Sequence, residues 1–187
     1  SYLVGDSVGS KSSITIVAGN GANDMDISAD ANIGTVKVTA GNGGNAINIE
    51  AATINVTAGT GADDIRVEGR DITVDAGGSG NTITVVGTDN DYTDGIYGAL
   101  IKINAGTNSV VNLGSGNDPQ SAANDDFPGT GELVAKVGSS ITGTNLTLVV
   151  DTVADLRAAT LSGITKIVLD DDNATYANSS PSNTDTD

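Results

Sequence analysis

The sequence contains no cysteine, histidine or tryptophan, and aromatic residues make up only 3% of its 187 residues. The absence of cysteine excludes disulfide bonds, thiolate metal sites and a cysteine nucleophile. The absence of histidine removes the commonest general base and the commonest transition-metal ligand. Few aromatic rings remain on which sugars or nucleic-acid bases can stack. The composition therefore argues against most catalytic and nucleic-acid-binding classes.

Basic residues are also scarce. The chain contains 8 Lys and Arg but 24 Asp and Glu, which gives a formal net charge of −16. Nucleic acid and anionic membrane surfaces both require a basic footprint, so we expect neither as a partner. No apolar run is long enough to cross a membrane, and we expect no membrane insertion. The chain begins at Ser1 without a signal peptide, which indicates a processed product or a piece of a longer polypeptide.

The sequence does contain an internal repeat. Ala-Gly pairs followed by alternating apolar residues recur at equal spacing at Ala40-Gly41, Ala58-Gly59 and Ala76-Gly77. Related pairs stand at Ala18-Gly19, beyond a short insertion, and at Ala105-Gly106, beyond a longer one. A short, fixed period is typical of solenoids, in which each repeat buries its apolar face only against its neighbours.

Each repeat contains two short segments of alternating apolar and polar residues, which predict two strands per coil with one buried face. Stacking the coils aligns the apolar residues in interior columns. One column is Ile14, Val36, Ile54, Ile72 and Ile101, and another is Met25, Ile47, Ile65 and Ile83. The predicted fold is all-β, a right-handed parallel β-solenoid or β-roll of about 18 residues per coil.

The pattern changes along the chain and predicts four segments. Residues 1–113 form the roll, and residues 114–131, which hold two of the three prolines, form a loop or boundary. Residues 132–172 form a small β-rich C-terminal cap, which an open solenoid end requires. Within it, Asp151 at an N-cap position predicts one short helix over Thr152–Thr160. Residues 173–187 are an acidic linker or tail rich in Ser, Asn and Thr.

The turn Ala58–Asp63 matches the motif G-G-x-G-x-D-x-U-x except for alanine at the first position. Its glycines allow the backbone to curl and offer carbonyls, and its aspartate can complete an oxygen cage for Ca²⁺. On these turns the chain resembles the RTX (repeats-in-toxin) parallel β-roll family of secreted bacterial surface-layer and adhesin proteins, with degenerate repeats over residues 14–113. The resemblance implies calcium as a cofactor, with Asp63 and Asp64 as metal ligands.

Three turns depart from the family pattern because they carry an asparagine, Asn23, Asn45 or Asn81, at the ligand position. An amide supplies one neutral oxygen, so these turns should bind calcium more weakly. Stacked asparagines can instead hydrogen-bond their own turns and one another without metal. We expect such a metal-free ladder at the three Asn turns, and both readings stay open for Asp63.

The insertion in residues 87–98 holds a second candidate cation site. Asp89, Asp91 and Asp94 resemble a D-x-D-x-D-G calcium loop with one residue added, and the alternative is a solvated acidic loop. Tyr92 and Tyr97 on the same insertion are candidate contacts for a glycan or a receptor. The alternative is that these two rings only fasten the loop to the roll.

The function that we expect is a non-catalytic structural module of an extracellular, cell-surface assembly that associates with itself or with neighbouring subunits. A viral fibre or decoration protein and a glycan- or receptor-binding module are alternatives. A polysaccharide-active β-helix enzyme is a minor one, because it needs a converging acid–base pair that the sequence does not display. In the tail, Asn173 and Asn178 are the accessible glycosylation sequons.

Overall fold

The computed structural model describes residues 2–5, 13–29, 34–87, 99–114, 133–151 and 154–170. These residues form β-strands joined by turns, and no helix occurs among them. The strands are β1 Tyr2–Gly5, β2 Ser13–Val17, β3 Asp24–Ser28, β4 Thr35–Thr39, β5 Ala46–Glu50, β6 Thr53–Ala58, β7 Asp64–Gly69, β8 Asp71–Ala76, β9 Thr82–Gly87, β10 Leu100–Thr107, β11 Val110–Gly114, β12 Leu133–Val134, β13 Ser140–Thr144, β14 Leu146–Asp151, β15 Ala154–Asp155, β16 Thr160–Leu161 and β17 Ile164–Asp170. The all-β class predicted from the sequence is confirmed.

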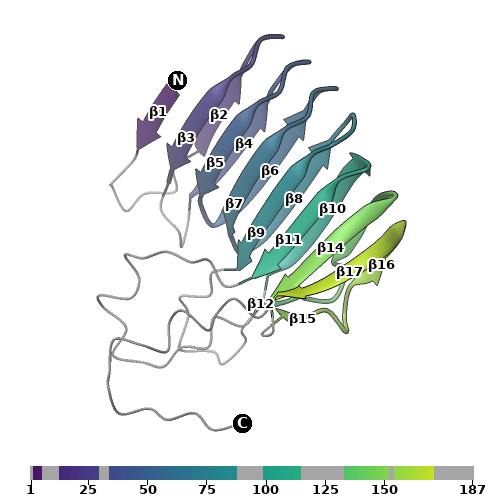
Figure 1. Ribbon diagram of the computed structural model, residues 1–187. Coiled ribbons are helices and arrows are strands. Elements are labelled where there is room, and N and C mark those ends of the chain that lie inside the picture. The colour runs from purple at the N-terminus through teal and green to yellow at the C-terminus, as the bar shows by residue number, and fades with distance from the viewer. Residues whose placement is uncertain are drawn as a thin grey trace, which may run out of the picture.

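Successive strands alternate between two parallel sheets. Sheet A has eight strands in the order β1-β3-β5-β7-β9-β11-β14-β17, and sheet B has seven in the order β16-β13-β10-β8-β6-β4-β2. Figure 1 shows the two sheets as two layers, with β1 and β2 at one end and β16 and β17 at the other. We call this arrangement the two-sheet stack.

The core lies between the two sheets and consists mainly of isoleucine, valine and alanine. In β4, β6 and β8 the residues alternate between buried and more exposed, as side chains in a strand must. The parallel register aligns both predicted columns, Ile14-Val36-Ile54-Ile72-Ile101 and Met25-Ile47-Ile65-Ile83. These columns are therefore confirmed. Each fully buried isoleucine contributes about 1.5–3 kcal/mol of hydrophobic free energy relative to an exposed one.

The strands after residue 132 continue the same two sheets. β13 pairs with β10 in sheet B, and β14 pairs with β11 in sheet A. β16 and β17 then add a further strand to each sheet. Among the described strands, β12 and β15 alone pair outside these sheets, as a two-stranded sheet. The β-rich segment that the sequence predicted as a cap is thus joined to the stack by backbone hydrogen bonds.

The helix predicted over Thr152–Thr160 is not formed by the described part of that segment, residues 154–160. Ala154–Asp155 is strand β15, residues 157–158 make a turn, and Thr160 begins β16. The Thr160 amide donates to the Ser139 carbonyl at 2.9 Å, which attaches this segment to sheet B. A short isolated helix is marginal in water, so pairing to an existing sheet outweighs local helix propensity.

The turn after β15 is closed by one aspartate and one arginine. Oδ1 of Asp155 accepts hydrogen bonds from the backbone amide of Arg157 at 3.0 Å and from its Nε at 2.9 Å. These bonds from Arg157 lower the pKa of Asp155 from 3.8 to about 2. An aspartate that hydrogen-bonds the backbone two residues on favours a turn over a helix interior.

No helix in the described part of the chain is long and apolar enough to cross a membrane.

Candidate functional site

One column of polar residues lies at the turns that precede the strands of sheet A. Its members stand directly before β3, β5, β7, β9 and β11, and the backbone carbonyl of each accepts a hydrogen bond from a backbone amide of the next repeat. We call the column the asparagine ladder, which consists of Asn23, Asn45, Asp63, Asn81 and Ser109. The last four are buried polar residues, which fold stably only when their polar atoms find partners.

Hydrogen bonds run through the ladder from each turn to the next. The backbone amides of Asn45, Asp63 and Asn81 donate to the side-chain oxygen of the following member at 2.9, 2.9 and 3.0 Å. The side-chain amides of Asn23 and Asn45 also close their own turns, whereas Asn81 Nδ2 donates to the carbonyls of Ala76 at 3.4 Å and of Ala105, in the next repeat, at 3.0 Å. Asn45 Nδ2 donates to the carbonyls of Gly41 and Gly43 at 3.2 and 2.6 Å, and Asn23 makes the same pair of bonds. The hydrogen bonds expected within the turns of Asn23 and Asn45 are therefore present.

Asp63 breaks this pattern because a carboxylate has no donor. Its Oδ1 accepts from the backbone amide and Nδ2 of Asn45 at 2.9 and 2.7 Å. Asp63 is only 2% exposed, yet its buried Oδ2 has no hydrogen-bond partner among the described residues. Asp63 stands one repeat after Asn45, and its Oδ2 takes the place of Asn45 Nδ2. The carbonyls of Gly59 and Gly61 take the place of the Gly41 and Gly43 carbonyls to which that Nδ2 donates.

This chemistry fits a hard cation. A carboxylate oxygen and backbone carbonyls are the ligands that Ca²⁺ prefers, and a buried unpaired anionic oxygen is costly without one. Asp64 does not join this arrangement, because it is exposed and adjacent strand residues face opposite sides of a sheet. The two carboxylates expected to act together are thus placed apart. No group of three or more acidic residues able to hold a metal occurs among the described residues.

The turns are packed closely enough to exclude side chains at certain positions. A Cβ at Gly61 would overlap the Gly43 carbonyl of the preceding turn, and a Cβ at Gly43 would overlap the Gly21 carbonyl in the same way. At Gly21, which has the same place in the first turn, nothing lies within 4 Å of such a Cβ. Stacking of the turns therefore requires glycine at positions 43 and 61.

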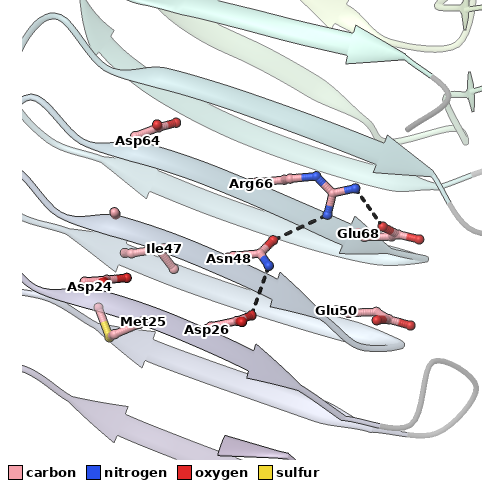
Figure 2. Close-up of a pocket in the computed structure, with 10 residues that line it drawn as sticks. Asp24, Met25, Asp26, Ile47, Asn48, Glu50, Asp64, Arg66 and Glu68 are labelled. Carbon is pink, nitrogen blue, oxygen red and sulfur yellow. Dashed lines mark hydrogen bonds and ion pairs between the residues drawn. The ribbon is translucent and has the colours of Figure 1, made fainter. Parts of the chain in front are cut away.

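The outer face of sheet A carries a polar network that the sequence analysis did not identify. Figure 2 shows Asn48 between its neighbours, with Nδ2 donating to Asp26 Oδ1 at 3.0 Å and Oδ1 accepting from Arg66 Nη1 at 3.3 Å. Arg66 also pairs with Glu68 Oε2 at 3.0 Å. These residues line an open hollow of about 600 Å³ together with other acidic residues, Asp24, Glu50 and Asp64. Asn48 and Arg66 occupy equivalent positions in successive repeats, and this spacing in the sequence could have predicted the network.

The remaining predicted site residues lie outside the described part of the chain. They are Asp89, Asp91, Asp94, Tyr92 and Tyr97 of the insertion, and Asn173 and Asn178 of the tail.

Comparisons with family models, with curated proteins and with solved structures find no match for this chain. The likeness to RTX-type turns therefore rests on the turn residues themselves.

Proposed function

We propose that this chain is a right-handed parallel β-solenoid that serves as a non-catalytic structural module of an extracellular surface assembly. The observation that carries the proposal is the regular pairing of the two-sheet stack. From β3 to β14, each strand of sheet A is paired on both sides, over a core that runs through both sheets. Such a stack is a stiff rod whose length grows with the number of repeats, which suits a spacer between contacts.

The outer polar groups also favour a structural role. Asp26, Asn48 and Arg66 belong to three neighbouring strands and hydrogen-bond one another along the face of sheet A. Cross-strand polar pairs of this kind stabilise a sheet by about 0.2–1 kcal/mol each. The two acidic groups at the ends of this network, Asp26 and Glu68, are used for contacts within the sheet.

We propose calcium as a stabilising ion at Asp63. Oδ2 of Asp63 and the carbonyls of Gly59 and Gly61 would hold it, and the ion would neutralise the buried carboxylate. A site with one carboxylate should be weak, in the range of about 10⁻⁴–10⁻³ M that extracellular calcium modules show. Calcium at such concentrations favours a location outside the cell.

The calcium part is tested by the melting temperature of the full chain with 10 mM CaCl₂ and with a chelator. A site at ten times its dissociation constant adds about 1.4 kcal/mol to the free energy of unfolding. For a chain of this size we expect a rise of about 3–6 °C. Equal melting temperatures in the two solutions would remove calcium from the proposal.

The structural part is tested by electron microscopy and sedimentation of the full chain over a wide concentration range. A module of an assembly should form ordered oligomers as its concentration rises, and calcium should strengthen them if it stiffens the turns. A chain that remains monomeric throughout would count against a self-associating module.

A further inference from the structure

The last strand of sheet A presents core-type residues at an open end of the stack. Ile167 pairs in register with Leu148, and Leu169 pairs with Val150. Leu148 is only 1% exposed, yet Ile167 and Leu169 are 59% and 76% exposed. They occupy the two inner columns that are buried in β3, β5, β7 and β9, so β17 carries the pattern of an internal strand at a position that no described residue covers.

The backbone at this end is open as well. Among the described residues, β17 pairs only with β14 and β16 only with β13. A seven-residue edge strand with apolar side chains is a template for a further strand. At the opposite end, β1 and β2 are the outer strands of the same sheets, and Ile14 and Ile16 are half-buried where Val36 and Val38 are fully buried. Figure 1 shows these two ends.

Residues 171–187 supply no large aliphatic side chains that match the inner columns. They contain no Ile, Leu, Val, Met or Phe, whereas Ile, Leu, Val and Met supply the large residues of the inner columns. The β1–β2 end of a second copy of the chain does supply strands and apolar residues, among them Ile14 and Ile16, that match the inner columns. Every strand pair described in both sheets is parallel, so a copy added at β17 in the same direction would present its β1–β2 end.

One pair of opposite charges favours the same pairing. One outward-facing column of sheet A begins with Asp24, passes through Asp64 and ends with Lys166. In a stacked second copy, Asp24 would follow Lys166 two strands later, about 10 Å away at the usual strand spacing. A lysine side chain spans most of that distance, so opposite charges would meet across the contact.

We infer that the C-terminal edge formed by β16 and β17 binds the N-terminal edge formed by β1 and β2 of a second copy, head to tail. This inference rests on the proposed structural role and names the contact through which the module assembles. The contact joins two different surfaces at opposite ends of the stack, so each added copy extends the sheets in one direction and the product is an open-ended filament.

The test is sedimentation velocity and electron microscopy of the full chain and of the double variant Ile167→Lys/Leu169→Lys. Both residues are exposed, so the variant should keep the wild-type melting temperature. It should remain monomeric where the wild type forms filaments. The two added lysines change the net charge from −16 to −14, which lowers general repulsion, so lost assembly would not be a charge artefact. Val137→Lys, at an exposed apolar residue outside β17, is the control and should assemble like the wild type.

A mixing experiment determines the direction of the contact. The double variant retains its β1–β2 end, so it should add to wild-type filaments, stop their growth and shorten them. The inference is overturned if the double variant assembles like the wild type, which would leave the structural role in place with a different contact. It is also overturned if the wild type stops at a dimer that the variant neither joins nor shortens, because that indicates a symmetric contact between two β17 strands. A wild type that never associates contradicts both the contact and the self-associating role.

Discussion

Nδ2 of Asn45 donates a hydrogen bond to Oδ1 of Asp63 across neighbouring turns at 2.7 Å. The bond joins an amide, which both donates and accepts, to a carboxylate, which only accepts. The amide satisfies its own turn through Gly41 and Gly43 as well. The carboxylate leaves Oδ2 buried without a partner among the described residues. This one position therefore decides whether the asparagine ladder is complete by itself or needs a cation.

Asp63→Asn should stabilise the chain in the presence of a chelator. The new amide would take the place of Oδ2 and donate toward the carbonyls of Gly59 and Gly61, as Asn45 does in its own turn. Removing an unsatisfied buried polar atom is worth about 1–3 kcal/mol. At about 2–4 °C per kcal/mol, the melting temperature should rise by several degrees. Asp64→Asn, one residue away and exposed, should leave it nearly unchanged. A lower melting temperature for Asp63→Asn would show that the carboxylate has a partner of its own.

The same substitution should abolish any response to calcium. If the ion binds through Oδ2 of Asp63, then Asp63→Asn should melt at one temperature with calcium and with chelator, because the amide nitrogen cannot act as a ligand. Differential scanning calorimetry in both solutions provides the comparison. Asp64→Asn should keep the full calcium response. A response that survives in Asp63→Asn would place the ion elsewhere in the chain.

Gly61→Ala should destabilise the stack where Gly21→Ala does not. The two glycines have the same place in their turns, but the Cβ at position 61 would overlap the Gly43 carbonyl, whereas nothing lies near position 21. Forcing an extra methyl group into a packed interior costs about 1–3 kcal/mol. Urea denaturation of both variants measures the difference. Equal midpoints would mean that the stacked turns move apart at little cost.

Arg157→Ala should raise the pKa of Asp155. Hydrogen bonds from Arg157 lower this pKa to about 2 from 3.8. Because the folded-state value is the lower one, the pair stabilises the fold above about pH 4, and that contribution is lost as the pH falls toward 2. In the variant, carboxyl-detected NMR should follow the titration of Asp155 back toward 3.8. An unchanged midpoint would show that the pair does not persist in solution.

The column register could be predicted from the sequence because it is a local, repeated property. Val36, Ile54 and Ile72 stand one repeat apart and alternate with polar neighbours, so any stacking of equal repeats must align them. The same reasoning anticipated hydrogen bonds within the turns of Asn23 and Asn45. In both cases each repeat supplies its neighbour with the same surface, and the period alone determines which residues meet.

Other features were decided only by the tertiary structure. The sequence assigned Thr152–Thr160 to a helix because capping and apolar spacing are local signals. The amide of Thr160 instead binds the Ser139 carbonyl, a partner in the preceding coil that no local pattern reveals. Asp63 and Asp64 look equivalent as adjacent carboxylates, but folding buries one beside the stacked turns and exposes the other. A period determines which residues align. The partners of a single polar atom such as Asp63 Oδ2 depend instead on how segments distant in the sequence pack around it.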